Sequence, residues 1–330
     1  MTSQLEPSVD IVLRDRSGTV ESLAADRLND LDRLVAADGA LLWVHLCRPS
    51  PTTIEQLGGE FDIHPLALED LAKQGQRPKI DLYEPQRHVV VYEAAPDAPT
   101  GVSELQLILG ENWLVSVHHE PTPMADAVHR RISGGGGGEL ARSLAGTLYL
   151  ILDAVTDSYF PELDRLSDRI EALEDEVIEQ RPRPESLGEV LTIRRRLLEQ
   201  RRVLGPMRDV ANALLRGDGR LVDRATLLYY QDLYDHLVRV LDQLDLYRDL
   251  LAAVLDARMS SVSNELNATM RRLTAVTVVI MVPTLIAGIY GMNFRAMPEL
   301  GLAWGYPVAL LLMVVAATAA ILFFRRKGWF

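Results

Sequence analysis

Two apolar stretches near the C-terminus constrain most strongly what this chain can fold into. Residues 273–290 and 307–324 are each about 18 residues long, close to the minimum for crossing a bilayer core of about 30 Å. Neither contains Asp, Glu, Lys, Arg or His. Because backbone groups in lipid must satisfy their own hydrogen bonds, both stretches are predicted to be transmembrane helices. A buried hairpin in a soluble core is the alternative, which the matching basic flanks disfavour.

The flanking charges predict the orientation of these two helices. Arg271 and Arg272 precede the first stretch, and the tail 325–330 after the second begins with three basic residues. Basic residues favour the cytoplasmic side, so the loop 291–306 is expected outside. The N-terminus has no apolar signal core. We therefore expect a multi-pass protein of the inner (plasma) membrane, embedded in the lipid bilayer, with both termini in the cytoplasm.

Polar and small residues recur at helical spacing through the first span and the segment before it, and we call them the polar stripe. Residues three and four apart share one face of a helix. The stripe could face a water-filled pore or pack against another helix, since Thr and small residues also suit helix contacts. Its growing polarity toward residue 256 favours the pore. One helix cannot enclose a pore, so a homo-oligomer follows. The polar stripe comprises Asp256, Ser260, Ser263, Asn267, Met270, Thr274, Thr277, Met281, Thr284, Gly288 and Gly291.

Composition excludes several classes of function. The formal net charge of −12 over 330 residues argues against nucleic acid as a partner. The single cysteine, Cys47, excludes a disulfide framework. Gly134–Gly138 lacks the Lys-Ser/Thr of a phosphate-binding loop and is interpreted as a connector. His118, His119 and Glu120 could ligate a metal, but a loop at a strand end is preferred. No catalytic constellation is found, and the protein is not expected to be an enzyme.

The soluble part is predicted to be an α+β domain followed by long helices. Residues 1–135 form the α/β domain, 136–220 a helical hairpin of opposite charges, and 221–272 a stalk helix continuous with the first span. If residues 221–290 form one helix, about 70 residues make a rod of roughly 100 Å. Strands are expected at Asp10–Leu13, Leu41–Leu46, His88–Tyr92, Leu105–Leu109 and Trp113–Val117, the later ones as an antiparallel meander. Helices are expected at Leu23–Ala36, Pro51–Glu60, Leu66–Ala72, Glu139–Gln180 with a kink at Pro161, and Glu185–Arg216.

The loop after the first span carries the most specific motif. Gly291-Met292-Asn293 ends that span, Met297-Pro298-Glu299-Leu300 follows, and a basic tail closes the chain. In this setting the sequence resembles the CorA magnesium channels of the 2-TM-GMN class. The likeness extends upstream through His64-Pro65-Leu66, Gln76-Arg77-Pro78-Lys79, Asp232-Leu233-Tyr234-Asp235-His236 and Ser260-Ser261-Val262-Ser263-Asn264. It covers nearly the whole chain and is least secure before residue 40.

The resemblance implies a funnel-shaped homopentameric channel for Mg²⁺, with Co²⁺ and Ni²⁺ as further ions. The first span of each subunit would line the pore and the second would form an outer ring. Asn293 would form the selectivity ring beside Gly291 and Met292, with Glu299 retained in the outer loop. Met270 and Leu273 match an apolar constriction and Met281 a second one. Asp70 and Asp232 match carboxylates that bind a regulatory divalent ion between subunits.

One residue departs from the family pattern and two other functions stay open. Arg295 stands in the outer loop where many relatives carry an acidic residue, so a ring of Arg295 would weaken the negative field there. A Zn²⁺ transporter of the ZntB branch, coupled to protons, is the first alternative. Proton coupling usually needs an ionisable residue in the membrane, and neither span has one. The second alternative is a membrane-anchored structural protein without transport, which the polar stripe disfavours.

Overall fold

The computed structural model describes residues 8–15, 18–35, 40–120, 123–133, 138, 140–179, 183, 186–217, 221–292 and 297–330. The chain forms two compact units, one of residues 1–176 and 182–252 and one of residues 177–181 and 253–330. The first unit holds the sheet and the helices that cover it. The second holds the two apolar helices.

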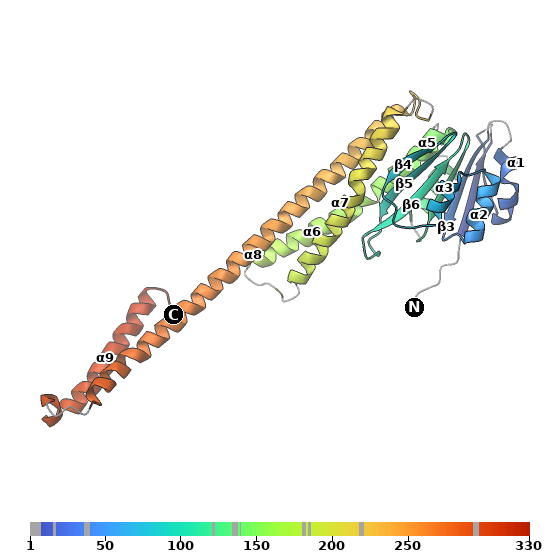
Figure 1. The fold of residues 1–330 in the computed structure, drawn as a ribbon. Helices are drawn as coiled ribbons and strands as arrows, with labels where there is room; N and C mark the ends of the chain where they lie inside the picture. The colour runs from blue at the N-terminus through green and yellow to red at the C-terminus, as the bar shows by residue number, and fades with distance from the viewer. Residues whose placement is uncertain are drawn as a thin grey trace. The chain divides into compact units, whose positions relative to one another are not determined.

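A seven-stranded sheet with the strand order β2-β1-β3-β7-β6-β5-β4 forms the centre of the first unit (Figure 1). Neighbouring strands are antiparallel except β3 and β7, which are parallel, with Val44 opposite Val115. The strands are β1 (Ser8–Arg14), β2 (Val20–Leu23), β3 (Leu41–Cys47), β4 (Lys79–Tyr83), β5 (Gln86–Ala94), β6 (Val102–Leu109) and β7 (Trp113–His118).

All five predicted strands are confirmed, and the predicted meander corresponds to the antiparallel run β4 to β7. Two strands were not predicted. β2 has only four residues, and its Leu23 was wrongly assigned to a helix. β4 begins at Lys79 and contains Asp81, charged residues that strands usually avoid. Both are edge strands of the sheet, where charged side chains can reach solvent.

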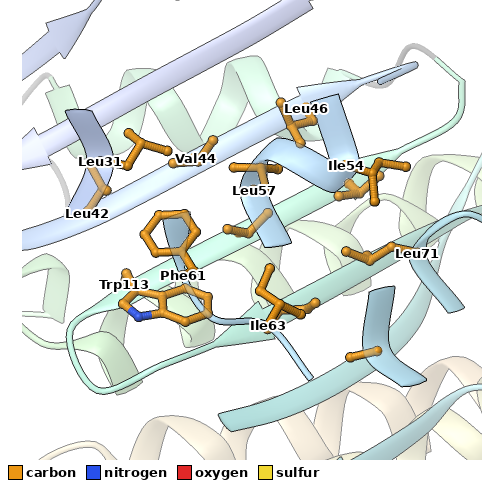
Figure 2. Close-up of a cluster of buried hydrophobic side chains, with 14 of the residues drawn as sticks. Leu31, Leu42, Val44, Leu46, Ile54, Leu57, Phe61, Ile63, Leu71 and Trp113 are labelled. Carbon is orange, nitrogen blue, oxygen red and sulfur yellow. The ribbon is translucent and has the colours of Figure 1, made fainter. Parts of the chain in front are cut away.

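An apolar core lies between one face of the sheet and helices α1 (Leu31–Val35), α2 (Pro51–Glu60) and α3 (Pro65–Leu71), with the 3-10 turn η1 (Ala25–Asp30) leading into α1. Figure 2 shows Leu57 of α2 and Leu71 of α3 among strand residues such as Val44, with Phe61 beside Trp113. The Phe61 and Trp113 rings stack with centroids 4.3 Å apart. Ser50 caps α2, its hydroxyl accepting a hydrogen bond from the Thr53 amide at 3.1 Å.

After β7 the chain forms helix α4 (Pro123–Ser133), the 3-10 turn η2 (Leu140–Arg142) and helix α5 (Leu144–Asp157). Helix α5 contacts β5 and β7. Helix α6 (Tyr159–Ile178) follows directly. The predicted helix Glu139–Gln180 is therefore two helices, divided at Ser158 rather than kinked at Pro161. Pro161 lies in the first turn of α6, where its missing amide hydrogen costs no intrahelical bond. The Ser158 hydroxyl accepts from the Ala94 amide at 2.9 Å and ties the break to the sheet.

Helix α7 (Ser186–Arg216) runs antiparallel to α6, because Arg196 pairs with Glu162 at 3.1 Å and Arg169 with Glu189 at 2.9 Å. The predicted hairpin of opposite charge is thus present. Of the residues that suggested it, the two pairs use only Arg196; the full set was Glu171, Glu174, Asp175, Glu176 and Glu179 against Arg194, Arg195, Arg196, Arg201 and Arg202. Arg201, expected to face those acids, pairs with Asp245 of the following helix at 3.0 Å.

Helix α8 (Leu227–Tyr290) is continuous over 64 residues, beginning six residues later than predicted, in the first unit, and ending in the second. The Asp223 carboxylate accepts from the Thr226 amide at 2.8 Å in the turn before it. A 3-10 turn, η3 (Pro298–Gly301), precedes α9 (Gly305–Arg326), which runs back in the opposite direction (Figure 1). Both α8 and α9 are helical and contain a stretch long and apolar enough to cross a membrane, as the two predicted spans require.

Candidate ion pathway and metal-binding clusters

The polar stripe lies on a face of α8 that is exposed in the single chain. Every member from Asp256 to Gly291 is exposed in the single chain, as is Leu273. The buried and half-buried positions of the membrane part lie between them, on other faces: Ala275, Val278, Val279, Val282, Pro283 and Ile286. The stripe is therefore free to face a neighbouring subunit or a water-filled axis.

The threonines of the stripe satisfy their own hydroxyl hydrogens. Thr274 Oγ1 donates to the Met270 carbonyl at 2.9 Å, Thr277 to Leu273 at 2.9 Å and Thr284 to Ile280 at 2.8 Å. Thr318 of α9, outside the stripe, makes the same bond, so the bond itself is a general solution for a hydroxyl in lipid. Each hydroxyl oxygen keeps lone pairs that can accept hydrogen bonds from water.

The loop motif begins where α8 ends. The Gly291 amide donates to the Ala287 carbonyl at 2.8 Å and the Met292 amide to Ile289 at 3.3 Å. A side chain at Gly291 would place its Cβ 3.1 Å from the Ala287 oxygen, a tight contact that glycine avoids. Asn293 and Arg295 lie outside the described residues. Glu299 belongs by its backbone to η3, and its side chain lies outside the described part.

Asp70 lies in a cluster of charged side chains on α3, β4 and β5. The Lys79 ammonium group is 2.7 Å from Asp70 Oδ2 and 2.7 Å from Asp81 Oδ2. Gln76 Nε2 donates to Asp70 Oδ1 at 3.3 Å, and His88 Nδ1 is 3.9 Å from Asp70 Oδ2. Burial acts to lower the pKa of Lys79, but its hydrogen bonds to Asp70 and Asp81 outweigh this and raise it. The ammonium group therefore stays charged between the two carboxylates.

Asp232 lies in a second cluster, formed by α5 and α8. Its Oδ1 is 3.6 Å from His236 Nε2, one helical turn away. His236 also offers a nitrogen within 4.8 Å of oxygens of Asp153 and Asp157. Asp153 pairs with Arg131 at 2.9 Å, and burial together with the Asp153 charge raises the pKa of Asp157. Asp70 and Asp232 thus belong to separate clusters within one chain.

The sequence alone did not indicate the partners in these clusters. Asp81, His88, Asp153 and Asp157 were not proposed as ligands, because their neighbours come from distant segments. The four-residue spacing of Asp153 and Asp157, and of Asp232 and His236, is a helical signal that could have found the second cluster. His118, considered as a ligand, is instead buried at the end of β7, its Nε2 3.3 Å from Glu93 Oε1.

An α/β unit, a helix that continues from it into an apolar span, and a second apolar helix define an integral membrane protein with a large soluble part. The chain belongs to the family of CorA-like Mg²⁺ transporter proteins, whose model matches residues 38–326.

Three relatives illustrate the breadth of this family. The cobalt/magnesium transport protein CorA of Thermotoga maritima is 36% identical over 87% of this chain and 83% of its own. The complete structure of the CorA magnesium transporter from Methanocaldococcus jannaschii matches with a TM-score of 0.84 at 24% identity, covering 97% of this chain and 98% of that one. The zinc transport protein ZntB of Cronobacter sakazakii is 23% identical over 96% of this chain and 94% of its own.

Proposed function

We propose that the protein is the subunit of a homopentameric channel that conducts Mg²⁺, and also Co²⁺ and Ni²⁺, into the cytoplasm. The observation that carries the proposal is the exposed polar stripe of α8, which continues from the first apolar span to Asp256. Five such helices around an axis would enclose a path lined by hydroxyl, amide and carbonyl oxygens. The name of the relative from Thermotoga maritima, a cobalt/magnesium transport protein, supports the choice of ions.

Selectivity is assigned to a ring of Asn293 with Gly291 and Met292. Mg²⁺ releases its waters reluctantly, so a filter that strips them carries a high cost. Asn carboxamides accept hydrogen bonds from those waters and leave the ion hydrated. A ring of carboxylates would hold the ion too tightly for conduction, which needs binding weak enough to release. If α8 runs outward, its C-terminal end adds a negative dipole near the loop, which favours cations.

The membrane potential supplies the driving force. A divalent ion that crosses 100 mV inward gains about 4.6 kcal/mol, twice the value for one charge. The path then narrows at rings of Met270 and Leu273 and of Met281, side chains exposed in the single chain. Apolar rings of this kind gate by drying, so the channel needs a device that widens them.

That device is assigned to Asp70 and Asp232 of adjacent subunits. Both carboxylates reach the surface, the side chain of Asp232 being 58% exposed and that of Asp70 21%. Two carboxylates brought together repel unless a cation neutralises them. Cytoplasmic Mg²⁺ bound between them would hold the subunits together and keep the apolar rings narrow. Loss of the ion would loosen the subunits and open the path.

Zn²⁺ transport is the second candidate, because the zinc transport protein ZntB matches nearly the full length of the chain. Coupling of Zn²⁺ to protons would need an ionisable group within the membrane, and residues 273–290 and 307–324 contain none. Flux into proteoliposomes separates the candidates: Mg²⁺ and Zn²⁺ uptake are compared with and without a pH gradient. For a Mg²⁺ channel, we expect Mg²⁺ uptake to increase with the membrane potential and to be independent of the pH gradient.

The selectivity ring is tested by Asn293→Ala. The variant should assemble as the parent does and lose Mg²⁺ uptake by at least about tenfold, because the ring no longer accepts hydrogen bonds from the hydrated ion. Thr318→Ala is the matched control, since it also removes a polar side chain from the membrane domain but lies on α9, outside the stripe. Parental uptake in an assembled Asn293→Ala pentamer would exclude this residue from the filter.

A further inference from the structure

The cluster around Asp70 holds three groups that can ligate a metal ion, all from one subunit. Asp81 and His88 are directly opposite each other on the antiparallel strands β4 and β5, so both side chains lie on the same face of the sheet. Asp70 comes from α3, which covers that face. One oxygen of each carboxylate and one nitrogen of His88 lie within 4.8 Å of one another.

The hydrogen bonds of His88 decide which ring nitrogen carries the proton. Gln106 Nε2 donates to the carbonyls of Asp70 at 3.1 Å and Lys73 at 2.9 Å, which orients the amide. The Gln106 carbonyl oxygen then faces His88 Nε2 at 3.0 Å and can only accept. Nε2 is therefore the protonated nitrogen, and Nδ1 carries the lone pair.

Among the residues that the structure describes, no group donates a hydrogen bond to that lone pair. His88 is completely buried, and Nδ1 makes no hydrogen bond, yet it lies 3.9 Å from Asp70 Oδ2, another atom that can only accept. A buried acceptor without a donor is costly. Histidines that ligate metals donate their other ring N–H to an oxygen acceptor, as His88 Nε2 does to Gln106, and keep the remaining lone pair for the metal.

We propose that Asp70, Asp81 and His88 form a binding site for a divalent transition-metal ion, Co²⁺, Ni²⁺ or Zn²⁺. When no metal is bound, the Lys79 ammonium group occupies this site. Imidazole suits these ions, whereas Mg²⁺ takes oxygen ligands. Two ligand atoms about 2.1 Å from a shared ion lie about 3–4.2 Å apart, a range that includes the distance from His88 Nδ1 to Asp70 Oδ2.

Lys79 acts as a tethered competitor in this site. Its ammonium group bridges Asp70 and Asp81 at 2.7 Å each, the position a divalent ion would take. The side chain is 30% exposed, so it can swing into solvent when a metal enters. Displacing this cation weakens metal affinity, and the site therefore responds only when transition metal is abundant. The site goes beyond the proposed channel function and shares only Asp70 with the regulatory pair.

Equilibrium binding of Co²⁺ to the full-length protein in detergent, without a polyhistidine tag, tests the proposal. Lys79→Met should tighten binding at least about tenfold, because the competing charge is gone. Asp81→Asn and His88→Gln should each weaken it at least about tenfold. X-ray absorption with one equivalent of Co²⁺ should show imidazole scattering in the parent that is lost in His88→Gln. Asp249→Asn, a change at an exposed carboxylate of α8, is the matched control.

The variants also separate this site from the regulatory pair. Asp232→Asn should leave unchanged the imidazole scattering that His88→Gln removes, because one subunit supplies every ligand of this site. Loss of that scattering in Asp232→Asn would assign the ion to the regulatory pair and overturn the proposal. Asp81 and Lys79 lie near the surface, so their variants decide the matter even if the buried His88→Gln protein fails to assemble. Parental affinity in Asp81→Asn, or in Lys79→Met, would equally overturn it. None of these readouts depends on ion flux.

Discussion

His45 shows how a single buried side chain is held in one protonation state. Its Nδ1 is 2.9 Å from Ser116 Oγ, and the Trp43 indole donates to the same oxygen at 2.9 Å. Because an indole can only donate, the Ser116 hydroxyl hydrogen is free to point at His45 Nδ1, which is then an acceptor. Burial, and secondarily the neighbouring His118, lower the pKa of His45 to about 3. The ring is neutral throughout the physiological range of pH.

This residue predicts a pH dependence of stability. The unfolded chain protonates histidine below about pH 6.5 whereas folded His45 resists to about pH 3. Its contribution is therefore fully present above pH 6.5 and is lost as the pH falls toward 3, by at most about 1.4 kcal/mol per pH unit. Thermal unfolding of the full-length protein between pH 7.5 and 5 measures this slope.

Two variants at the same position isolate the titration from the hydrogen bond. His45→Asn keeps an acceptor for Ser116, and His45→Phe does not, but neither titrates. Both should flatten the loss of stability below pH 6.5, although His45→Phe should be less stable at every pH. A slope as steep as the parent's in both variants would mean that other groups cause it.

At the scale of the element, α8 must serve two environments with one continuous helix. Its membrane part exposes the stripe threonines and also apolar side chains such as Leu285, which is 60% exposed in the single chain. Exposure in one subunit therefore does not distinguish a pore-facing residue from a lipid-facing one. Polarity and helical phase make the distinction, because residues on the stripe share one angular sector.

Cysteine labelling tests that phase. In a Cys47→Ala background, single cysteines at Thr277, Met281 and Thr284 should react with small charged thiol reagents when the channel is open, at least about tenfold faster than at Leu285. A charged reagent reaches water-lined positions and not lipid. Val278, which is half-buried, provides a second unreactive reference. Comparable rates at Thr284 and Leu285 would show that the stripe does not line water.

At the scale of the whole molecule, we propose that divalent ions bound between adjacent subunits keep the channel closed. In one chain Asp70 shares the Lys79 ammonium group with Asp81, while Asp232 has His236 at 3.6 Å. A weak intersubunit site suits a sensor of high ion levels, since an ion shifts a two-state balance only by its differential affinity.

The double variant Asp70→Asn/Asp232→Asn tests this gating. It should conduct Mg²⁺ at internal concentrations that close the parent, shifting the closing concentration upward by at least about tenfold. Patch-clamp current at rising internal Mg²⁺ measures the shift, and Asp249→Asn controls for loss of a surface charge on α8. Closure at the same internal Mg²⁺ concentration as the parent would show that the sensor lies elsewhere, for example among the acidic residues between Glu162 and Glu179.

The local sequence pattern was sufficient to predict those elements whose formation does not depend on the segments packed against them. Charge-free runs predicted both spans because lipid allows a single chain segment only one way to satisfy its backbone. Alternating apolar residues predicted five strands because a half-buried strand repeats every two residues. The short strand β2 and the charged strand β4 were not predicted, because their stability comes from pairing with β1 and β5 rather than from their own residues.

Contacts between distant segments were decided only by the tertiary structure. Nothing in the separate sequences of β3 and β7 shows that they pair in parallel, and that pairing brings His45 and Ser116 together across 71 positions. The same holds for Asp70, Asp81 and His88, whose ligand atoms meet because α3 packs where β4 and β5 pair. Sequence patterns report the periodicity of one element against solvent or lipid. Which polar groups meet depends on how elements pack, a property of the whole fold.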